Sequence, residues 1–272
     1  MVRRSQAANS YKASPTGPTP SGPVLTIDRV SKVFTKRDEE FVALSDISVD
    51  LHQGEFLSLV GPSGCGKSTL LKIVAGLLAP TTGRVSFEGE PMVEPRAEIG
   101  LMFQTSTLFP WRNVIRNISL PFEIAGIDDI DIDQRIAEVI DLVRLNGFEE
   151  HYPRELSGGM QQRVALCRLL VSDPHLMLLD EPFGSVDEFT REYLNQELAR
   201  ITEHQHKTAL FVTHNIREAV FLSDRVVVMG THPGRVLDIL EIDLPRPRLP
   251  ESQRLPAYNE TVLKVRDLMG LV

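Results

Sequence analysis

Runs of apolar residues alternate along the chain with polar segments, and their spacing predicts which segments are strands and which are helices. Residues 41–51 carry apolar side chains at nearly every second position, which is typical of a strand with one buried face. Residues 56–60 and 176–179 are almost continuously apolar, as strands buried on both faces of a parallel sheet are. Further strands are expected at residues 24–30, 85–87, 99–103, 209–213, 225–229 and 236–240.

Other segments have the 3.6-residue period of a helix. Residues 132–145 place apolar side chains on one helical face, at Ile136, Val139, Ile140 and Val143. Helices are also expected at residues 68–78, 159–170 and 189–201, with a short one from about Asn259. The stretch from Thr105 to about Ser172 is therefore expected to be a mainly helical insertion. Strands that alternate with helices predict an α/β fold with a largely parallel sheet.

Composition limits the class of protein. The 272 residues suffice for a sizeable core, and no apolar run approaches the roughly 18–20 residues of a membrane-spanning helix. A net charge of −8 disfavours a nucleic-acid surface, because neutralising phosphates requires clustered Lys and Arg. Cys65 and Cys167 form no disulfide framework or metal pattern, which fits a reducing compartment. Residues 1–23 lack an apolar signal segment and are expected to be a disordered tail.

One run fits the phosphate-binding pattern G-x-x-x-x-G-K-[ST], and it consists of Gly61, Pro62, Ser63, Gly64, Cys65, Gly66, Lys67, Ser68 and Thr69. An apolar strand precedes this P-loop and an apolar helix follows it. The glycines let backbone N–H groups point inward, and the helix N-terminus adds partial positive charge. Lys67 is expected to reach the β- and γ-phosphates of ATP, and the Ser68 hydroxyl to bind Mg²⁺. Cys65 is expected to contribute only its backbone.

A second apolar strand ends in two acidic residues. Residues 176–179 deliver Asp180 to the carboxyl end of a buried strand, and Glu181 follows directly. Such a strand end is common, but behind a P-loop it favours a catalytic interpretation. Asp180 is then expected to hold Mg²⁺ through water, and Glu181 to accept a proton from the attacking water.

The run Leu156-Ser157-Gly158-Gly159-Met160-Gln161-Gln162 lies between these two motifs. With it, the chain resembles the ATP-binding subunits of ABC transporters, from about Val24 to Arg248. Three more runs look most like the nitrate, sulfonate and taurine importer branch, and they are Leu108-Phe109-Pro110-Trp111, Glu181-Pro182-Phe183-Gly184 and Leu244-Pro245-Arg246-Pro247-Arg248.

The resemblance implies an ATPase with a particular organisation. Its fold would be a P-loop core with a largely parallel sheet, an antiparallel β subdomain, and a helical subdomain inserted after Gln104. The implied boundaries are a tail at 1–23, an ATPase domain at 24–243 with its helical part at about 105–172, and a short extension at 244–272. Only about sixty residues follow His214, so we expect no large C-terminal regulatory domain like that of the sugar-importer relatives.

The resemblance also assigns roles outside the P-loop. Ser157, Gly158 and Gly159 open a helix, and such an N-terminus is a second anion site. In the family this site faces the ATP held by a second subunit. Gln104 is implied to contact Mg²⁺ and the attacking water, and His214 the γ-phosphate. The acid of the loop that crosses the dimer is Asp187, in the run Gly184-Ser185-Val186-Asp187 where Ser-Ala-Leu-Asp is commoner.

Two assignments stay open on the sequence alone. Phe34 aligns with the family aromatic that stacks on adenine and is the preferred candidate, although it could instead be a core aromatic. Phe41 is a rival because the linker Thr35–Glu40 is long. Leu108, Phe109 and Trp111 either anchor a permease or pack inside the helical subdomain, and Pro110 prevents a regular helix there.

The expected function is that of an energy-coupling subunit of an importer. Its expected partners are a second copy in a head-to-tail dimer, transmembrane permease subunits, and indirectly a solute-binding protein, with no nucleic acid. It would sit peripherally on the cytoplasmic face of the membrane, with ATP and Mg²⁺ bound. A DNA-repair or ribosomal ABC ATPase is disfavoured by the single cassette and acidic charge, and a catalytically dead module by the intact motif residues. The solute is not specified by this chain.

Overall fold

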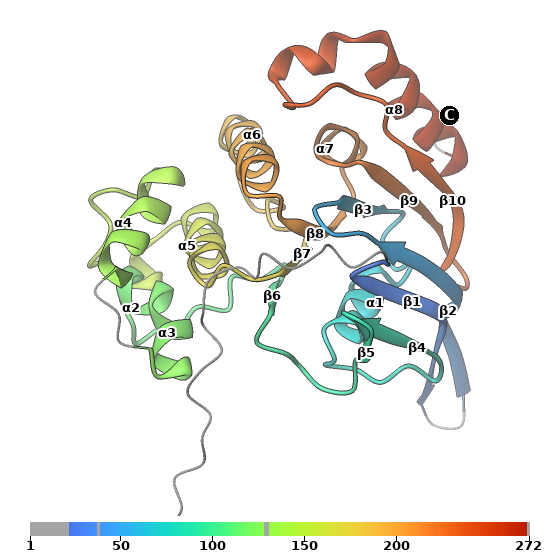
Figure 1. Cartoon of the computed structure of the whole chain (residues 1–272), viewed down its shortest axis with the longest axis horizontal. Coiled ribbons are helices and arrows are strands. Elements are labelled where there is room, and N and C mark those ends of the chain that lie inside the picture. Colours follow the sequence, from blue (N-terminus) through green and yellow to red (C-terminus); the bar gives the residue numbers. More distant parts are fainter. Residues whose placement is uncertain (1–21, 37–38, 128–130, 271–272) are drawn as a thin grey trace, which may run out of the picture.

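The core of the molecule is a six-stranded sheet with a smaller antiparallel sheet on one side and helices on the other (Figure 1). The computed structural model describes residues 22–36, 39–127 and 131–270. The tail expected at residues 1–23 therefore lies almost entirely outside the described residues. Within the described ranges, no helix is both long and apolar enough to cross a membrane.

The six-stranded sheet has the order β10-β9-β3-β8-β7-β6, and only β10 runs antiparallel to its neighbour. Its strands are β3 (Phe56–Val60), β6 (Ile99–Met102), β7 (Leu176–Asp180), β8 (Thr208–Thr213), β9 (Arg225–Gly230) and β10 (Arg235–Glu241). Every residue of β3, β7 and β8 is buried, because both faces of the sheet are covered. The largely parallel sheet predicted from the apolar runs is confirmed.

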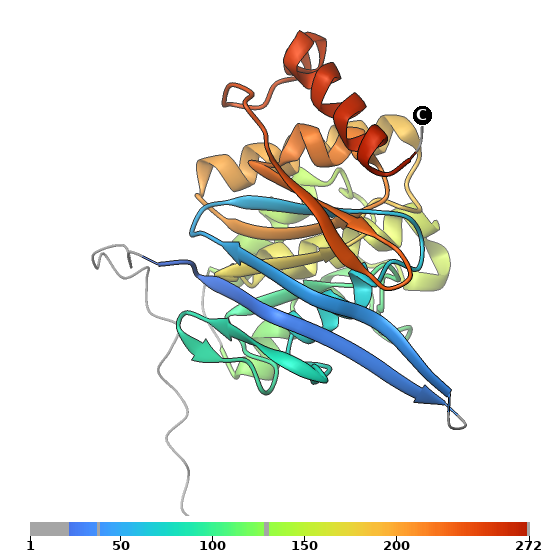
Figure 2. The same ribbon diagram turned by 90° about the vertical axis from the view of Figure 1, so that its right-hand side faces the viewer.

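The smaller sheet is antiparallel, with the order β2-β1-β4-β5. It consists of β1 (Leu25–Lys36), β2 (Glu39–Leu51), β4 (Thr82–Phe87) and β5 (Glu90–Pro91). In β2 the residues Ile47, Val49 and Leu51 are buried while Ser48 and Asp50 are exposed, as the alternating sequence predicts. Figure 2 shows the long strands β1 and β2 crossing in front of the parallel sheet.

The two faces of the parallel sheet belong to different apolar cores. In β3, Leu57 and Leu59 join the core that contains helix α1 (Lys67–Val74) and the antiparallel sheet. Phe56 and Val60 point to the opposite face. Helices there are α5 (Gly158–Val171), α6 (Glu188–His204), α7 (Ile216–Leu222) and α8 (Pro256–Leu268). Helices α1 and α5 therefore lie on opposite sides of one sheet.

The segment between β6 and β7 is helical. It contains α2 (Val114–Ile118), α3 (Leu120–Ala125), α4 (Ile132–Leu142), the 3-10 turn η1 (Pro153–Glu155) and α5. Both α2 and α4 pack against α5, and Figure 1 shows the group at the end of the molecule away from the antiparallel sheet. The predicted fold class is confirmed.

Several element ends differ from the sequence-based expectation. The helix expected to reach residue 78 ends at Val74, because Gly76 has φ +71° and a side chain there would collide with the Glu94 backbone. The helix expected to reach 145 ends at Leu142, just before Arg144 at φ +55°. The short elements α2, α3, α7, β5 and η2 (Pro250–Arg254) were not predicted individually.

The C-terminal residues pack closely on the ATPase core. Leu244, Tyr258 and Val265 are buried among the apolar residues of α6 and α7. Arg246 forms ion pairs with Glu203 at 2.6 Å and Asp224 at 2.7 Å. The helix expected from about Asn259 begins three residues earlier, at Pro256.

Candidate nucleotide site

The P-loop joins the buried strand β3 to α1 and curls tightly. Gly66 has φ +92°, and a side chain there would collide with Leu44 and with the Ala43 carbonyl. Gly61 is equally confined, because its missing Cβ would lie 2.7 Å from both Cys65 Sγ and the Met229 carbonyl oxygen. Cys65 is fully buried, so its thiol packs inside the protein while its backbone forms part of the loop.

The start of α1 is open to an anion. Gly66 precedes the helix and offers no side-chain cap, whereas Ser157 and Asp187 cap α5 and α6. The first N–H groups of α1 therefore lack a side-chain partner, which is the condition for phosphate binding at a helix N-terminus. Lys67 Nζ donates to the carbonyl oxygens of Gly61 at 2.7 Å and Pro62 at 3.2 Å, which places its charge inside the loop.

Ser68 and Asp180 are in direct contact, so their oxygen atoms lie close enough together to share a metal ion. The Ser68 hydroxyl donates to Asp180 Oδ1 at 3.0 Å, linking the start of α1 to the end of β7. Burial raises the pKa of Asp180, although the hydrogen bond from Ser68 and the charge of Lys67 act to lower it. A cation beside this carboxylate would relieve that penalty.

The segments that follow three neighbouring strands meet at Glu181, and we call this meeting point the junction. Its Oε2 accepts from Gln104 Nε2 at 3.2 Å and lies 3.1 Å from His214 Nδ1. Gln104 follows β6, Glu181 follows β7 and His214 follows β8, so the carboxyl ends of adjacent parallel strands bring them together. Glu181 has φ +45°, a left-handed conformation that a non-glycine residue adopts at a cost, and such strain is frequent at functional sites.

The oxygen atoms at this junction suit Mg²⁺. A serine hydroxyl, a carboxylate and an amide oxygen, from Ser68, Asp180 and Gln104, are the hard ligands that this ion prefers. Within the described ranges, no group of three or more His, Cys, Asp or Glu side chains could hold a metal. Mg²⁺ keeps several waters and binds substrate phosphates in many sites, so a few protein oxygen donors suffice for it.

Several supporting residues were not anticipated from the sequence. Gln162, in the Leu156–Gln162 run, donates its side-chain amide to the Gln104 carbonyl oxygen. Arg168, on the same helix α5, donates to the carbonyl oxygens of Ser106 at 3.2 Å and Thr107 at 3.1 Å. The segment after Gln104 is therefore held by α5. The repeated Gln161-Gln162 was a visible signal, whereas nothing local to Arg168 pointed to this role.

Four predicted site residues lie apart from the P-loop. Ser157, Gly158 and Gly159 begin α5 on the opposite face of the parallel sheet from α1. Ser157 and Gly158 are exposed, and nothing lies within 4 Å of where a Gly158 side chain would begin. Asp187 is also exposed and caps α6, accepting from the Thr190 N–H at 3.0 Å. Hydrogen bonds from the Thr190 side chain and backbone hold the pKa of Asp187 below the usual range.

Phe34 and Phe41 lie directly opposite each other in the β1–β2 ladder. Both are exposed, at 41% and 56%, so neither is the core aromatic that the sequence left possible. Lys32 Nζ lies 5.2 Å from the centre of the Phe34 ring. The geometry leaves either ring available for stacking on a base.

The Leu108–Trp111 segment is divided between core and surface. Leu108 packs against the core, whereas Trp111 is 69% exposed with its ring 5.2 Å from that of Phe109. The side-chain amide of buried Asn117 fixes the segment by donating to the carbonyl oxygens of Phe109 and Arg112. The alternative in which all three apolar residues pack internally is therefore wrong for Trp111.

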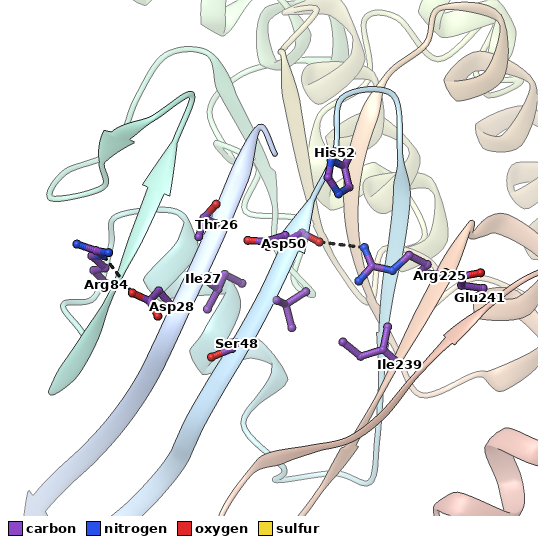
Figure 3. Close-up of a pocket in the computed structure, with 11 residues that line it drawn as sticks. Thr26, Ile27, Asp28, Ser48, Asp50, His52, Arg84, Arg225, Ile239 and Glu241 are labelled. Carbon is purple, nitrogen blue, oxygen red and sulfur yellow. Dashed lines mark hydrogen bonds and ion pairs between the residues drawn. The ribbon is translucent and has the colours of Figure 1, made fainter. Parts of the chain in front are cut away.

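A groove of about 810 Å³ lies between the antiparallel sheet and strands β9 and β10, and it shares no residue with the P-loop (Figure 3). Its charges are largely paired within the protein. Arg84 lies 3.2 Å from Asp28, and Arg225 contacts Glu55 at 3.0 Å and the Asp50 carbonyl at 3.1 Å. The groove is therefore separate from the candidate nucleotide site at the P-loop and Glu181.

Comparison with known proteins gives one family. A family model described as ABC transporter matches residues 44–184. An uncharacterized ABC transporter ATP-binding protein of Methanocaldococcus jannaschii is 44% identical over 241 residues, covering 89% of this chain and 90% of that protein. An aliphatic sulfonates import ATP-binding protein of Bacillus cereus is 42% identical over 248 residues, covering 91% and 98%.

Two further similarities add detail. A nitrate import ATP-binding protein of Synechococcus elongatus is 45% identical over 241 residues, which are 87% of this chain but 37% of that longer protein. A solved dimeric ATP-binding cassette in a post-hydrolysis state, bound to ADP and phosphate, superposes with a TM-score of 0.74 at 31% identity. That match covers 80% of this chain and 98% of the cassette.

Proposed function

The chain belongs to the ABC transporter family as an ATP-binding, ATP-hydrolysing subunit, and we propose that it energises the import of a small oxyanion-bearing solute such as nitrate, a sulfonate or taurine. The solute class is supported by the nitrate and sulfonate import proteins that it resembles over most of its length. The observation that carries the catalytic part is the junction at Glu181, where Gln104 and His214 converge beside the Ser68–Asp180 contact.

The residues divide the work of hydrolysis between charge and proton transfer. Lys67 and the free N–H groups of α1 neutralise phosphate charge, which stabilises the transition state more than the ground state. Glu181 accepts the proton of the attacking water, and Gln104 and His214 fix the position of its carboxylate. Ser68, Asp180 and Gln104 would hold a Mg²⁺ ion, which would supply positive charge to offset that of the phosphates.

A complete site requires a second copy of the chain. Ser157, Gly158 and Gly159 form the capped start of a helix on the opposite face of the sheet from α1, which follows the P-loop. This helix start is therefore separated from the P-loop of the same chain by the sheet. In a head-to-tail dimer, this start would face the ATP of the partner, with Asp187 at the same contact. The dimeric cassette of similar fold supports such an arrangement.

The remaining partners are transmembrane. Trp111 is a large exposed aromatic on a segment fixed by Asn117, and it suits an anchor for a permease subunit. The chain would then lie on the cytoplasmic face of the membrane, where ATP is available, with a solute-binding protein acting indirectly on the other side. The domain boundaries at 24–243 and 244–272 remain our proposal, although the C-terminal residues share the core of α6 and α7.

Uptake measurements test the proposal. Cells that lack the chain should lose ATP-dependent uptake of one labelled oxyanion from a panel of nitrate, taurine and alkanesulfonates. The wild-type chain should restore it, and Glu181→Gln should not. Restoration by Glu181→Gln, or retention of all uptake without the chain, would contradict the proposal.

A further inference from the structure

An arginine on α6 holds the loop that connects Glu181 to Asp187. Arg191 Nε donates to the Phe183 carbonyl oxygen at 3.2 Å, and Nη2 donates to the Val186 carbonyl oxygen at 2.7 Å. The remaining terminal nitrogen, Nη1, donates to Glu188 at 2.7 Å. Only a guanidinium has donors enough, in a rigid planar fork, to satisfy two carbonyls and a carboxylate together. Arg191 therefore contacts both ends of the loop at residues 183–187 and adds to the hydrogen bonds that the loop makes within itself.

A glutamate on α7 holds the turn that carries His214. Glu218 Oε2 accepts from the Thr213 hydroxyl at 2.8 Å, and the same hydroxyl oxygen accepts from the Asn215 N–H at 3.0 Å. The residues on both sides of His214 are thereby tied to one carboxylate. The Glu218 side chain is only 8% exposed, so solvent does not compete for these bonds.

The two residues meet beneath the catalytic junction. Arg191 Nε lies 3.7 Å from Glu218 Oε1, which also accepts from Asn195 Nδ2 at 3.4 Å. Arg191 and Glu218 line a small cavity together with Glu181 and His214. A displacement of the loop before Asp187 would therefore be transmitted through this contact to the turn that carries His214, and the reverse also holds.

The energetics of the pair favour a positional role. Burial raises the pKa of Glu218, despite hydrogen bonds from Thr213 and Asn195 and the charge of Arg191. Desolvation offsets much of the attraction within a buried ion pair, so such a pair contributes little to stability compared with an apolar replacement. Its geometric effect on two loops is the larger consequence.

We propose that Arg191 and Glu218 are positioning residues for hydrolysis, which lock the loop that ends at Asp187 to the turn that presents His214 to Glu181. The inference rests on the proposed role of Glu181 and deepens it. Asp187 is exposed, so a second chain can contact it, and His214 borders Glu181. The Arg191–Glu218 pair therefore connects the exposed Asp187 loop to Glu181, the residue proposed to activate water. Neither side chain contacts the P-loop.

Conservative substitutions in the full-length chain test the inference. In Glu218→Gln, the new amide group would face Asn195 Nδ2 or the Thr213 hydroxyl, so one of the acceptor positions is lost. In Arg191→Lys, one ammonium cannot span both carbonyls. We expect kcat to fall about ten- to a hundredfold in each, the scale of a small misplacement of reacting groups, while the Kd for ATP changes less than about twofold. A matched control is Arg200→Lys, on the exposed face of α6 with its own partner Glu197, which should keep the wild-type kcat.

The double variant distinguishes a shared role from two separate ones. If the residues act through their mutual contact, Arg191→Lys with Glu218→Gln should be no slower than the slower single variant. Multiplied losses, or wild-type kcat in chains with a lowered melting temperature, would overturn the inference. A wild-type chain without ATPase activity would overturn the proposed function as well, whereas normal hydrolysis in these variants would overturn the positioning role alone.

Discussion

At the scale of single residues, the site depends on a few side chains whose contacts are short and directional. Lys67 is nearly buried and points into the P-loop, while Asp180 carries a charge that its surroundings penalise. The buried charge of Asp180 favours a bound cation over stability of the unliganded chain. Function and stability are therefore expected to respond in different directions when Asp180 is changed.

Replacing Lys67 by alanine should weaken ATP binding. A charge-assisted contact contributes roughly 1.5–3 kcal/mol, so affinity should fall by about one to two orders of magnitude. Hydrolysis should fall further, because the same charge serves the transition state. Equilibrium binding of a fluorescent ATP analogue and steady-state turnover measure the two effects, and unchanged turnover at saturating ATP would refute the assignment.

Replacing Asp180 by asparagine should stabilise the metal-free chain while abolishing hydrolysis. A carboxyl whose pKa is raised in the folded chain binds its proton more tightly there, so the free energy of unfolding falls as pH rises through that pKa. Asparagine removes this loss. In EDTA, the melting temperature of the variant relative to wild type should increase as pH is raised from about 4 toward neutrality. A difference that is the same at every pH would count against the buried charge as its cause.

At the scale of elements, long or strongly patterned segments were predictable and short ones were not. Strands β3 and β7 follow from continuous apolar runs, and the P-loop from its motif and flanks. The helices α2 and α3 are five and six residues long, so they contain too few turns to show a period. Similarly, the motifs identified Glu181 and His214, but Arg191 and Glu218 were missed because their partners are distant in sequence and meet only in the fold.

Substitution of Trp111 tests whether this exposed side chain binds the permease or stabilises the helical subdomain. Because its side chain is mostly exposed, Trp111→Ala should change the free energy of unfolding by no more than about 0.5 kcal/mol. Binding to the permease and solute-stimulated hydrolysis should nevertheless be weakened. The contrasting variant is Phe122→Ala, at a buried position of α3, which should cost about 3–5 kcal/mol and lower the melting temperature. A strongly destabilised Trp111→Ala chain that still bound the permease would contradict the docking role.

At the scale of the whole molecule, the parallel sheet separates the two helix starts that we propose as phosphate-binding sites. The P-loop lies at the head of α1 on one face, and Ser157 lies at the head of α5 on the other. In our proposal, closure of a site would therefore depend on association between two chains rather than on folding within one. Nucleotide should control the oligomeric state, because each ATP would be bound by the P-loop of one chain and the α5 start of the other.

Glu181→Gln should make this dependence visible. The amide cannot accept the proton of water at neutral pH, so ATP would bind and remain intact. We expect a monomer without nucleotide and a dimer with ATP and Mg²⁺, measured by size-exclusion chromatography with light scattering. The combined variant Lys67→Ala with Glu181→Gln should stay monomeric. Rapid hydrolysis by Glu181→Gln would show that another group is the base.

The placement of α1 and α5 on opposite faces of the sheet also has a genetic consequence. Lys67→Ala damages one half-site of a chain, and Ser157→Arg damages the other, so each variant alone should be inactive. When the two are mixed, every heterodimer unites the intact P-loop of one with the intact α5 start of the other. Hydrolysis should reappear on mixing, and two alleles that each fail alone should complement one another.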